Sequence, residues 1–403
     1  MKRYWLSIVL ALFGVCGIAG YYVFGASDEL PAFKLTTISG DPKEAEPLQI
    51  TAQYENRIKL KYLYLTTKGS RYQPDEGLLD RPRPSWMDYP FYRKLLKDHR
   101  GFMRKKTVDS SLYVDEKRLV YADVRSETDR ADYTIILDIL DRASEETLHK
   151  EGTMPLPELN NWTIVSDVQV RGEDLHVLVQ KSVKLRTGNE VRYEYVDHVF
   201  DLTGKHKRDM KLDFGLETPN NSTYFIYRNG EVGSSEFAGF WSQEQQQSEA
   251  DFDGTPYWTY RAYTYSYDTG RITQVGDARL EKPNTPGYMY ENWLEAGVFY
   301  TARSDHAKHS LEVERHELGT KRKHALTIEY DTLGGKELQS IRITAGRIYL
   351  LLSIPESEEE LLVALDVSNG KVLYKGKISA EDGTENVMDV NQDLRPVRID
   401  YNY

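Results

Sequence analysis

Apolar and polar residues alternate over many short stretches of the chain, and this pattern predicts β-strands. Each stretch holds a short strand, a turn with glycine or a pair of polar residues, and then a more apolar strand rich in β-branched and aromatic side chains. The stretches that show the pattern begin at Ile50, Leu112, Val168, Asn221, Tyr288 and Ile341, the copy at Asn221 being the least regular. We therefore expect an all-β domain built from a repeated unit.

A second hairpin follows the later copies, and its turn contains a glycine. The four glycines are Gly204, Gly270, Gly319 and Gly370. Aspartate begins three of these turns, because its carboxylate can accept hydrogen bonds from backbone N–H groups two residues on. Glycine ends them because the left-handed conformation costs it least. Residues 137–146 (LDILDRASEE) occupy the same place after an earlier copy but contain no glycine.

A four-stranded unit that recurs about every 40–50 residues is typical of the blades of a β-propeller. The segment ALDVSNGKVLYKG, residues 364–376, resembles the blade hairpins of PQQ-type and WD40-like propellers, in which Asp-x-x-x-Gly-Lys closes the outer hairpin. The Trp-Asp dipeptide and a regular Trp after Gly-Lys are missing. The resemblance implies a propeller of about six four-stranded blades over residues 48–403, or seven if the tail at residues 386–403 pairs with the first strand. An irregular pair of β-sandwiches is the alternative, which the steady length of the unit disfavours.

Two segments interrupt the repeat and are predicted to be insertions in the domain. Residues 73–106 contain a basic, aromatic stretch in which we expect a helix over residues 89–97. Residues 230–257 contain the polar sequence WSQEQQQSEADFDG, which we expect to form a loop between two strands of one copy.

The N-terminal run at residues 5–24 (WLSIVLALFGVCGIAGYYVF) has no charged residue and predicts a membrane-spanning helix. Twenty residues at 1.5 Å each reach about 30 Å, the thickness of the hydrocarbon core of a bilayer. Lys2 and Arg3 precede the run, so the positive-inside rule places residues 1–4 in the cytoplasm and the linker at residues 25–47 outside, followed by the domain. This predicts a single-pass protein of the cell membrane that contacts the lipid bilayer through its anchor. A cleaved signal peptide is the alternative, although its apolar region is normally shorter.

The net charge of the chain bears on its partners, and its cysteine content bears on its origin. The net charge is -11, which disfavours nucleic acid as a partner. Cys16 is the sole cysteine and lies in the N-terminal run, so the domain has neither a disulfide nor a thiolate zinc site. An extracytoplasmic domain without cysteine is less usual in the eukaryotic secretory route, and we therefore favour a bacterial origin.

Recognised catalytic and cofactor-binding motifs are absent from the sequence. It has no Gly-x-Ser-x-Gly, no P-loop and no dinucleotide fingerprint, so we predict no catalytic residue, no cofactor and no metal. His306, His309, His316 and His324 lie close in sequence, but the segment is basic and lacks a zinc-type spacing, which favours a polar surface over a metal site. The acidic run at residues 356–360 is most simply a solvated loop.

Aromatic side chains alternate along residues 257–265, which places Tyr257, Tyr263 and Tyr265 on one face of a strand. An exposed row of rings would stack on sugars of the cell wall, whereas buried rings would fill the space between two sheets. We favour the buried arrangement, because propeller sheets are covered on both faces.

The basic insertion is the strongest local departure from the acidic character of the chain, and it is our candidate partner surface. Its residues are Arg81, Arg83, Trp86, Arg93, Lys94, Lys97, Arg100, Arg104, Lys105 and Lys106. Such a surface would contact an anionic wall polymer, the membrane surface or an acidic protein. A solvated helix with internal salt bridges is the alternative.

Three functions are compatible with these observations. The leading expectation is a membrane-tethered interaction or scaffolding module that binds an envelope protein or wall polymer. The alternative is an envelope enzyme that acts on a glycan or related polymer through carboxylates at the mouth of the propeller. A sensor that signals through the anchor is the third, because a cytoplasmic segment of about four residues is too short to fold as a domain.

Overall fold

The computed structural model of the 403-residue chain describes residues 5, 12–15, 30–55, 60–73, 90–106, 109–126, 132–155, 160–184, 191–215, 222–226, 233–246, 257–280, 290–305, 307–320, 322–354, 359–381 and 394–401. Of the predicted anchor at residues 5–24 it therefore includes Trp5 and residues 12–15 alone. No helix among these described residues is long and apolar enough to cross a membrane. The anchor stays a prediction.

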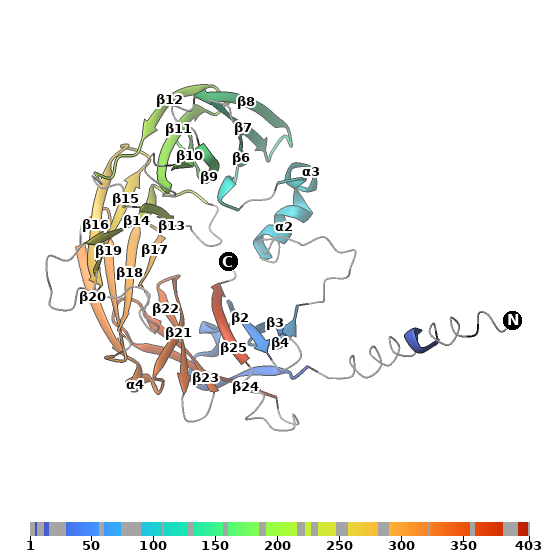
Figure 1. Cartoon of the computed structure of the whole chain (residues 1–403), viewed down its shortest axis with the longest axis vertical. Helices are drawn as coiled ribbons and strands as arrows, with labels where there is room; N and C mark the ends of the chain where they lie inside the picture. The colour runs from blue at the N-terminus through green and yellow to red at the C-terminus, as the bar shows by residue number, and fades with distance from the viewer. Residues whose placement is uncertain are drawn as a thin grey trace.

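The described residues form six antiparallel sheets, which lie side by side around a common centre (Figure 1). In chain order, sheet 1 contains β25 (Leu394–Tyr401), β2 (Leu48–Glu55), β3 (Leu60–Thr66) and β4 (Gly69–Tyr72). Sheet 2 contains β5 (Leu112–Val114), β6 (Arg118–Ser126), β7 (Asp132–Asp141) and β8 (Thr147–Pro155). Sheet 3 contains β9 (Asn160–Arg171), β10 (Asp174–Lys184), β11 (Val191–Asp201) and β12 (His206–Lys211).

The second half of the chain continues the same up-and-down order. Sheet 4 contains β13 (Ser222–Ile226), β14 (Phe237–Gln246), β15 (Tyr257–Ser266) and β16 (Ile272–Leu280). Sheet 5 contains β17 (Tyr290–Glu295), β18 (Val298–Asp305), β19 (Ser310–Glu317) and β20 (Arg322–Glu329). Sheet 6 contains β21 (Glu337–Thr344), β22 (Arg347–Ile354), β23 (Glu359–Asp366), β24 (Val372–Ala380) and β1 (Phe33–Gly40). The all-β prediction with its repeated four-stranded unit is confirmed, and the arrangement is propeller-like.

Short helices connect or cover the sheets. They are η1 (Pro42–Glu44), α2 (Pro90–Asp98), α3 (Arg100–Met103), η3 (Asp109–Ser111) and α4 (Tyr330–Leu333). The helix predicted at residues 89–97 is α2, one residue further along the chain.

Each sheet can bury both faces because side chains alternate along its strands. Along β10, Leu175, Val177 and Val179 pack against sheet 2, whereas Leu178 packs against sheet 4. All four side chains are fully buried. Burying a Val or Leu side chain contributes about 1.5–3 kcal/mol relative to leaving it exposed. The core is therefore a series of layers between neighbouring sheets.

The turns between the third and fourth strands follow the predicted chemistry at three of the four glycines, whereas Gly319 lacks the predicted positive φ angle. Gly204, Gly270 and Gly370 have positive φ angles of 79°, 66° and 72°. In the copy without glycine, Glu145 takes this place with a φ of 59°, and its N–H donates to the carbonyl of Asp141 at 2.9 Å. The repeat is thus kept with a side chain in a conformation that glycine adopts more easily.

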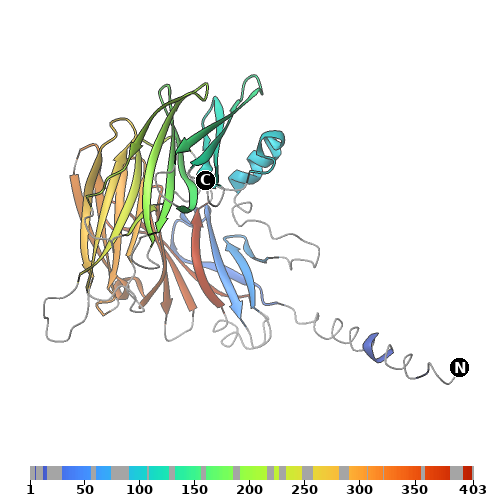
Figure 2. The same ribbon diagram turned by 45° about the horizontal axis from the view of Figure 1, so that its top comes forward.

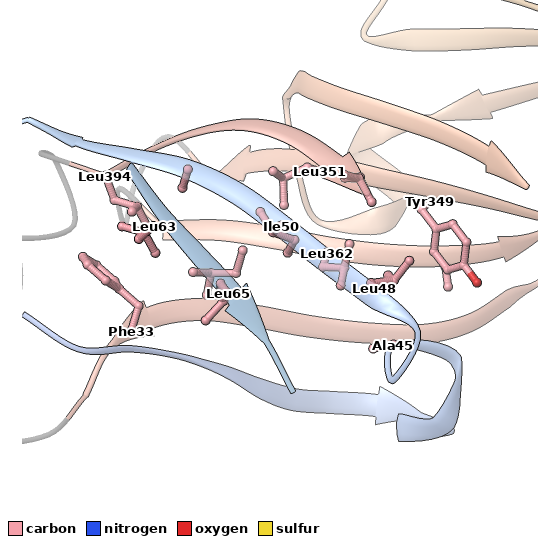
Figure 3. Close-up of a cluster of buried hydrophobic side chains, with 14 of the residues drawn as sticks. Phe33, Ala45, Leu48, Ile50, Leu63, Leu65, Tyr349, Leu351, Leu362 and Leu394 are labelled. Carbon is pink, nitrogen blue, oxygen red and sulfur yellow. The ribbon is translucent and has the colours of Figure 1, made fainter. Parts of the chain in front are cut away.

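The two ends of the chain complete each other's sheets. β25 from the C-terminus pairs with β2, and β1 from the N-terminus pairs with β24. Phe33 of β1 and Ile399 of β25 are buried in one apolar cluster between sheets 6 and 1, part of which Figure 3 shows. The pairing of the tail with the first strand of the repeat, which the sequence left open, is present. It completes sheet 1 and does not create a seventh sheet in the described residues.

Two predicted boundaries are wrong. The linker at residues 25–47 already contains β1 and η1, and Arg347 Nε donates to Glu44 Oε2 of η1 at 2.8 Å. The loop expected within residues 230–257 is partly strand, since β14 runs through the glutamine-rich sequence. Its polar residues have cross-strand partners, such as the Arg261–Glu244 ion pair at 2.8 Å, which the sequence pattern alone does not reveal.

The interlocked ends give a testable expectation for stability. Ile399→Ala removes a buried side chain from the cluster between sheets 6 and 1, and should lower the free energy of unfolding by about 2–4 kcal/mol in urea titrations. Arg395→Ala, an exposed position on the same strand, should change it by less than about 0.5 kcal/mol. Equal effects of the two substitutions would show that β25 contributes no core packing.

Candidate functional site

The basic insertion folds into two short helices that pack on sheet 2 (Figure 2). The buried apolar residues of this contact are Tyr92, Leu95, Phe102 and Met103 of the helices and Leu112, Leu119, Tyr121 and Leu140 of the sheet. Along β6, Leu119 and Tyr121 contact the helices, whereas Val120 and Ala122 pack toward sheet 3. The helices therefore cover the face of sheet 2 that is turned away from sheet 3.

Lys106 ties the end of this helix pair to sheet 2. Its Nζ lies 2.8 Å from a carboxylate oxygen of Asp138, donates to the carbonyl of Phe102 at 2.6 Å, and lies 5.1 Å from the ring centre of Tyr121. Burial alone would raise the pKa of Asp138, but hydrogen bonds from Lys106 and His149 outweigh it and lower that pKa. Lys106 thus has structural contacts with sheet 2, and its place in the predicted partner surface stays a prediction.

The other described cations of the insertion face solvent. We call them the basic face: Arg93, Lys94, Lys97, Arg100, Arg104 and Lys105. Their helices rest on an apolar contact, so the positive charge is presented on a fixed base in a chain of net charge -11. Arg81, Arg83 and Trp86 lie outside the described residues.

The other groups that the sequence singled out do not converge on a site. His309 and His324 lie at the surface, while His316 is mostly buried, with Nε2 3.3 Å from Glu314 Oε2. Burial lowers the pKa of His316. The surface interpretation therefore holds for His309 and His324 and is wrong for His316, while His306 lies outside the described residues. Among the tyrosines of residues 257–265, Tyr263 and Tyr265 are buried between sheets 3 and 4, which confirms the packing role.

The acidic run at residues 356–360 ends inside the fold. Glu360 is the second residue of β23, and Glu337 lies on the same face of sheet 6, with Ser353 in register between them. Burial, together with the charge of Glu337, raises the pKa of Glu360 to about 7. Glu360 Oε2 has no hydrogen-bond partner in the described part of the chain. A solvated loop is therefore the wrong description of Glu360, which keeps its proton close to neutral pH.

Two histidines and an aspartate that the sequence analysis missed come together at the outer edge of sheet 3. His198 Nδ1 and His206 Nε2 both lie 2.6 Å from Asp209 Oδ1. On its other side, His198 Nε2 lies 2.5 Å from the hydroxyl of Tyr133 in sheet 2. His198 is buried, whereas His206 and Asp209 are exposed. All three residues lie in the hairpin sequence VDHVFDLTGKHKRD, but that they meet can be recognised only from the strand register.

The protonation of this cluster follows from its burial. Burial lowers the pKa of His198 despite the hydrogen bond with Asp209, so its ring is neutral at neutral pH. Burial works against ionisation of Asp209, but hydrogen bonds from His206 and His198 lower its pKa. Burial also raises the pKa of Tyr133, which stays a phenol. A neutral ring donates from one nitrogen and accepts at the other, so the geometry fits a relay in which Tyr133 donates to His198 and His198 donates to Asp209.

A separate buried polar network locks sheets 3 and 4 together. Asp197 Oδ2 lies 2.7 Å from His176 Nδ1 and accepts a hydrogen bond from the hydroxyl of Tyr265 at 2.7 Å. Asp167 accepts a matching bond from Tyr267 at 2.7 Å. These side chains are almost wholly buried, so the network specifies packing and offers no access to a substrate.

Comparison with known proteins names no family for this chain. No family model matches the chain, and no curated protein resembles it significantly in sequence. A periplasmic gluconolactonase of Pseudomonas aeruginosa aligns with 88% of this chain and 99% of its own, at 8% identity and a TM-score of 0.30. An acylaminoacyl peptidase of Pyrococcus horikoshii aligns with 84% of this chain at 10% identity and a TM-score of 0.33, and this chain covers 47% of that enzyme. At this level of similarity neither activity is transferred, and the class that the fold defines is an all-β, propeller-like protein.

The different roles of two adjacent lysines can be tested. Lys106→Ala leaves the Asp138 carboxylate without its ammonium partner and should lower the free energy of unfolding by about 1–3 kcal/mol. Lys105→Ala, next to it on the basic face, should change stability by less than about 0.5 kcal/mol. Urea unfolding of both variants measures the difference, and a neutral Lys106→Ala would show that its contact with Asp138 does not stabilise the fold.

Proposed function

We propose that the chain is a non-enzymatic interaction module of the cell envelope, and that its basic face docks an acidic protein or anionic polymer. The observation that carries the proposal is the fixed presentation of the basic face: four of its six cations lie on α2 and α3, whose apolar side is buried against sheet 2, and Arg104 and Lys105 directly follow α3. A helix without a partner gains little from six like charges close together, since like charges on one face repel each other. An anionic partner would remove that repulsion.

The acidic character of the rest of the chain supports a localised contact. With a net charge of -11, most of the surface repels an anionic partner, so the basic face would set the orientation of docking as well as its affinity. The predicted anchor at residues 5–24 would hold this face near envelope components. Such binding would weaken as salt rises, because exposed charges are screened over about 8–10 Å at physiological ionic strength.

Charge reversal of the basic face tests this function. Arg93, Lys97, Arg100 and Arg104 are changed together to Glu in the full chain, and partners are crosslinked in cells and recovered from membranes. The recovery of the partner is expected to fall at least tenfold, because attraction becomes repulsion.

The matched control carries the same change of charge at exposed sites remote in sequence: Lys68→Glu, Arg271→Glu, Arg322→Glu and Lys371→Glu. It should recover the partner as the unmodified chain does. The proposal fails if the charge-reversed chain recovers the same partners, or if the unmodified chain enriches nothing over the N-terminal run alone.

A second candidate, an enzyme acting on an envelope polymer, is favoured by one observation, the pair formed by Glu360 and Glu337. A carboxyl group with a pKa of about 7 beside another carboxylate is the kind of pair that general acid catalysis uses. Strand spacing places their backbones about 10 Å apart, because two inter-strand steps of about 4.8 Å separate β21 from β23.

The enzyme candidate depends on the raised pKa of Glu360, which can be tested through the pH dependence of the free energy of unfolding. The folded state holds the Glu360 proton up to about pH 7 while the unfolded chain releases it near 4.5, so this group destabilises the fold progressively as pH rises between those values. Glu360→Gln should therefore be more stable than the unmodified chain by about 1–3 kcal/mol at pH 8, and the gain should vanish near pH 4.5. Glu116→Gln, at an exposed position, is the control and should change stability by less than about 0.5 kcal/mol at either pH. A flat difference for Glu360→Gln would remove the candidate acid.

A further inference from the structure

We infer that His198, His206 and Asp209 form a binding site for a divalent transition-metal ion, with Zn²⁺ as its simplest occupant and Tyr133 as the outer partner of His198. Two imidazoles and a carboxylate match the donors that zinc prefers, and these three ligand atoms all lie within 4.8 Å of one another. The inference is independent of the docking function proposed above.

The backbone brings the three ligands to one face of sheet 3. His198 on β11 and Asp209 on β12 are direct cross-strand partners. His206 would point to the opposite face from Asp209 in a regular strand, because it is three residues away. The pairing shifts between Val199 and Phe200, and this irregularity turns His206 back toward Asp209. Irregularities that re-aim one side chain are frequent beside functional sites.

The distances permit a metal after a small adjustment. Zinc binds nitrogen and oxygen ligands at about 2.0–2.2 Å, so tetrahedral ligand atoms lie about 3.3 Å apart. His198 Nδ1 and His206 Nε2 are each 2.6 Å from Asp209 Oδ1, and an opening of under about 1 Å is needed. His206 and Asp209 are exposed and can make this movement, while the buried His198 ring stays in place.

Tyr133 holds the ring of His198, the buried ligand of the proposed site, in its orientation. When a metal takes Nδ1 of His198, the proton leaves that nitrogen and Nε2 becomes the N–H, which then donates to the hydroxyl oxygen of Tyr133 at the present 2.5 Å contact. The ring keeps one proton throughout, so this change is a switch of tautomer. A hydrogen bond from the second ring nitrogen is the usual outer contact of a metal-bound histidine.

Lys181 is a nearby cation whose positive charge would oppose metal binding. Its Nζ lies 4.9 Å from the ring centre of Tyr133, and its charge interacts with Asp209, Glu194 and Lys211. Replacing this lysine by an apolar residue of similar length should therefore tighten metal binding.

The test is calorimetric titration of the purified full chain, without a histidine tag, with ZnCl₂. One Zn²⁺ per chain is expected, together with a rise in the melting temperature that EDTA reverses. His206→Ala and Asp209→Asn change exposed side chains and should fold normally, yet each should weaken Zn²⁺ binding more than tenfold. His324→Ala, an exposed histidine on β20, is the control and should leave binding unchanged.

Two further variants separate a metal site from a merely structural cluster. Tyr133→Phe should weaken Zn²⁺ binding about tenfold without abolishing it, as loss of an outer partner does. Lys181→Met should strengthen it. The inference is overturned if the unmodified chain binds no Zn²⁺, or if His206→Ala and Asp209→Asn bind it as tightly as the unmodified chain.

Discussion

The rest of the structure depends on the burial of both faces of each repeated sheet. A sheet that is apolar on both sides cannot end an array without a cover, because its last face would be exposed to water. Sheets 3 to 6 find that cover in their neighbours. Sheet 2 has a second apolar face, carried by Leu119, Tyr121 and Leu140, and the helix pair α2–α3 closes it. Sheet 1 differs, since Leu60 and Tyr62 of β3 are 54% and 42% exposed.

The need for a cover explains why the most basic segment of an acidic chain is fixed in place. One side of α2 and α3 must be apolar to close sheet 2, and Lys106 holds their end through Asp138. The opposite side is then free to vary without cost to the core. The cations of the basic face are exposed on that opposite side, and the docking proposal rests on this arrangement.

Much of the fold was predictable from the sequence, because the strands carry a strong period-two pattern and the turns carry their own chemistry. The same pattern failed at β1 and β14. FKLTTISG in β1 looks like a linker because only Phe33 in it is buried, and its partner strand β24 lies more than three hundred residues away. The glutamines of β14 look like a loop because nothing local shows which cross-strand neighbour they meet.

The candidate sites were also predictable to different degrees, because some of their residues are neighbours in sequence and others meet only in the folded chain. A run of basic residues is local, so six of its cations could be placed at the surface from sequence. Lys106 could not, because Asp138 lies thirty-two positions away and becomes its neighbour only through the packing of the helices on β7. The grouping of His198, His206 and Asp209 depends on a cross-strand register and on one irregular pairing, and neither is written in the spacing of the residues.

Strand β7 connects the two surfaces while keeping them apart. Asp138 points to the helices that carry the basic face, and Tyr133, five residues earlier, points to His198. Side chains an odd number of positions apart lie on opposite faces of a strand, so sheet 2 itself stands between the two sites. The exposed residues of each site, such as Arg100 and His206, share no contact partner in the described structure. Substitutions at such separated positions act additively, so the proposed docking and the proposed metal binding can be tested one at a time.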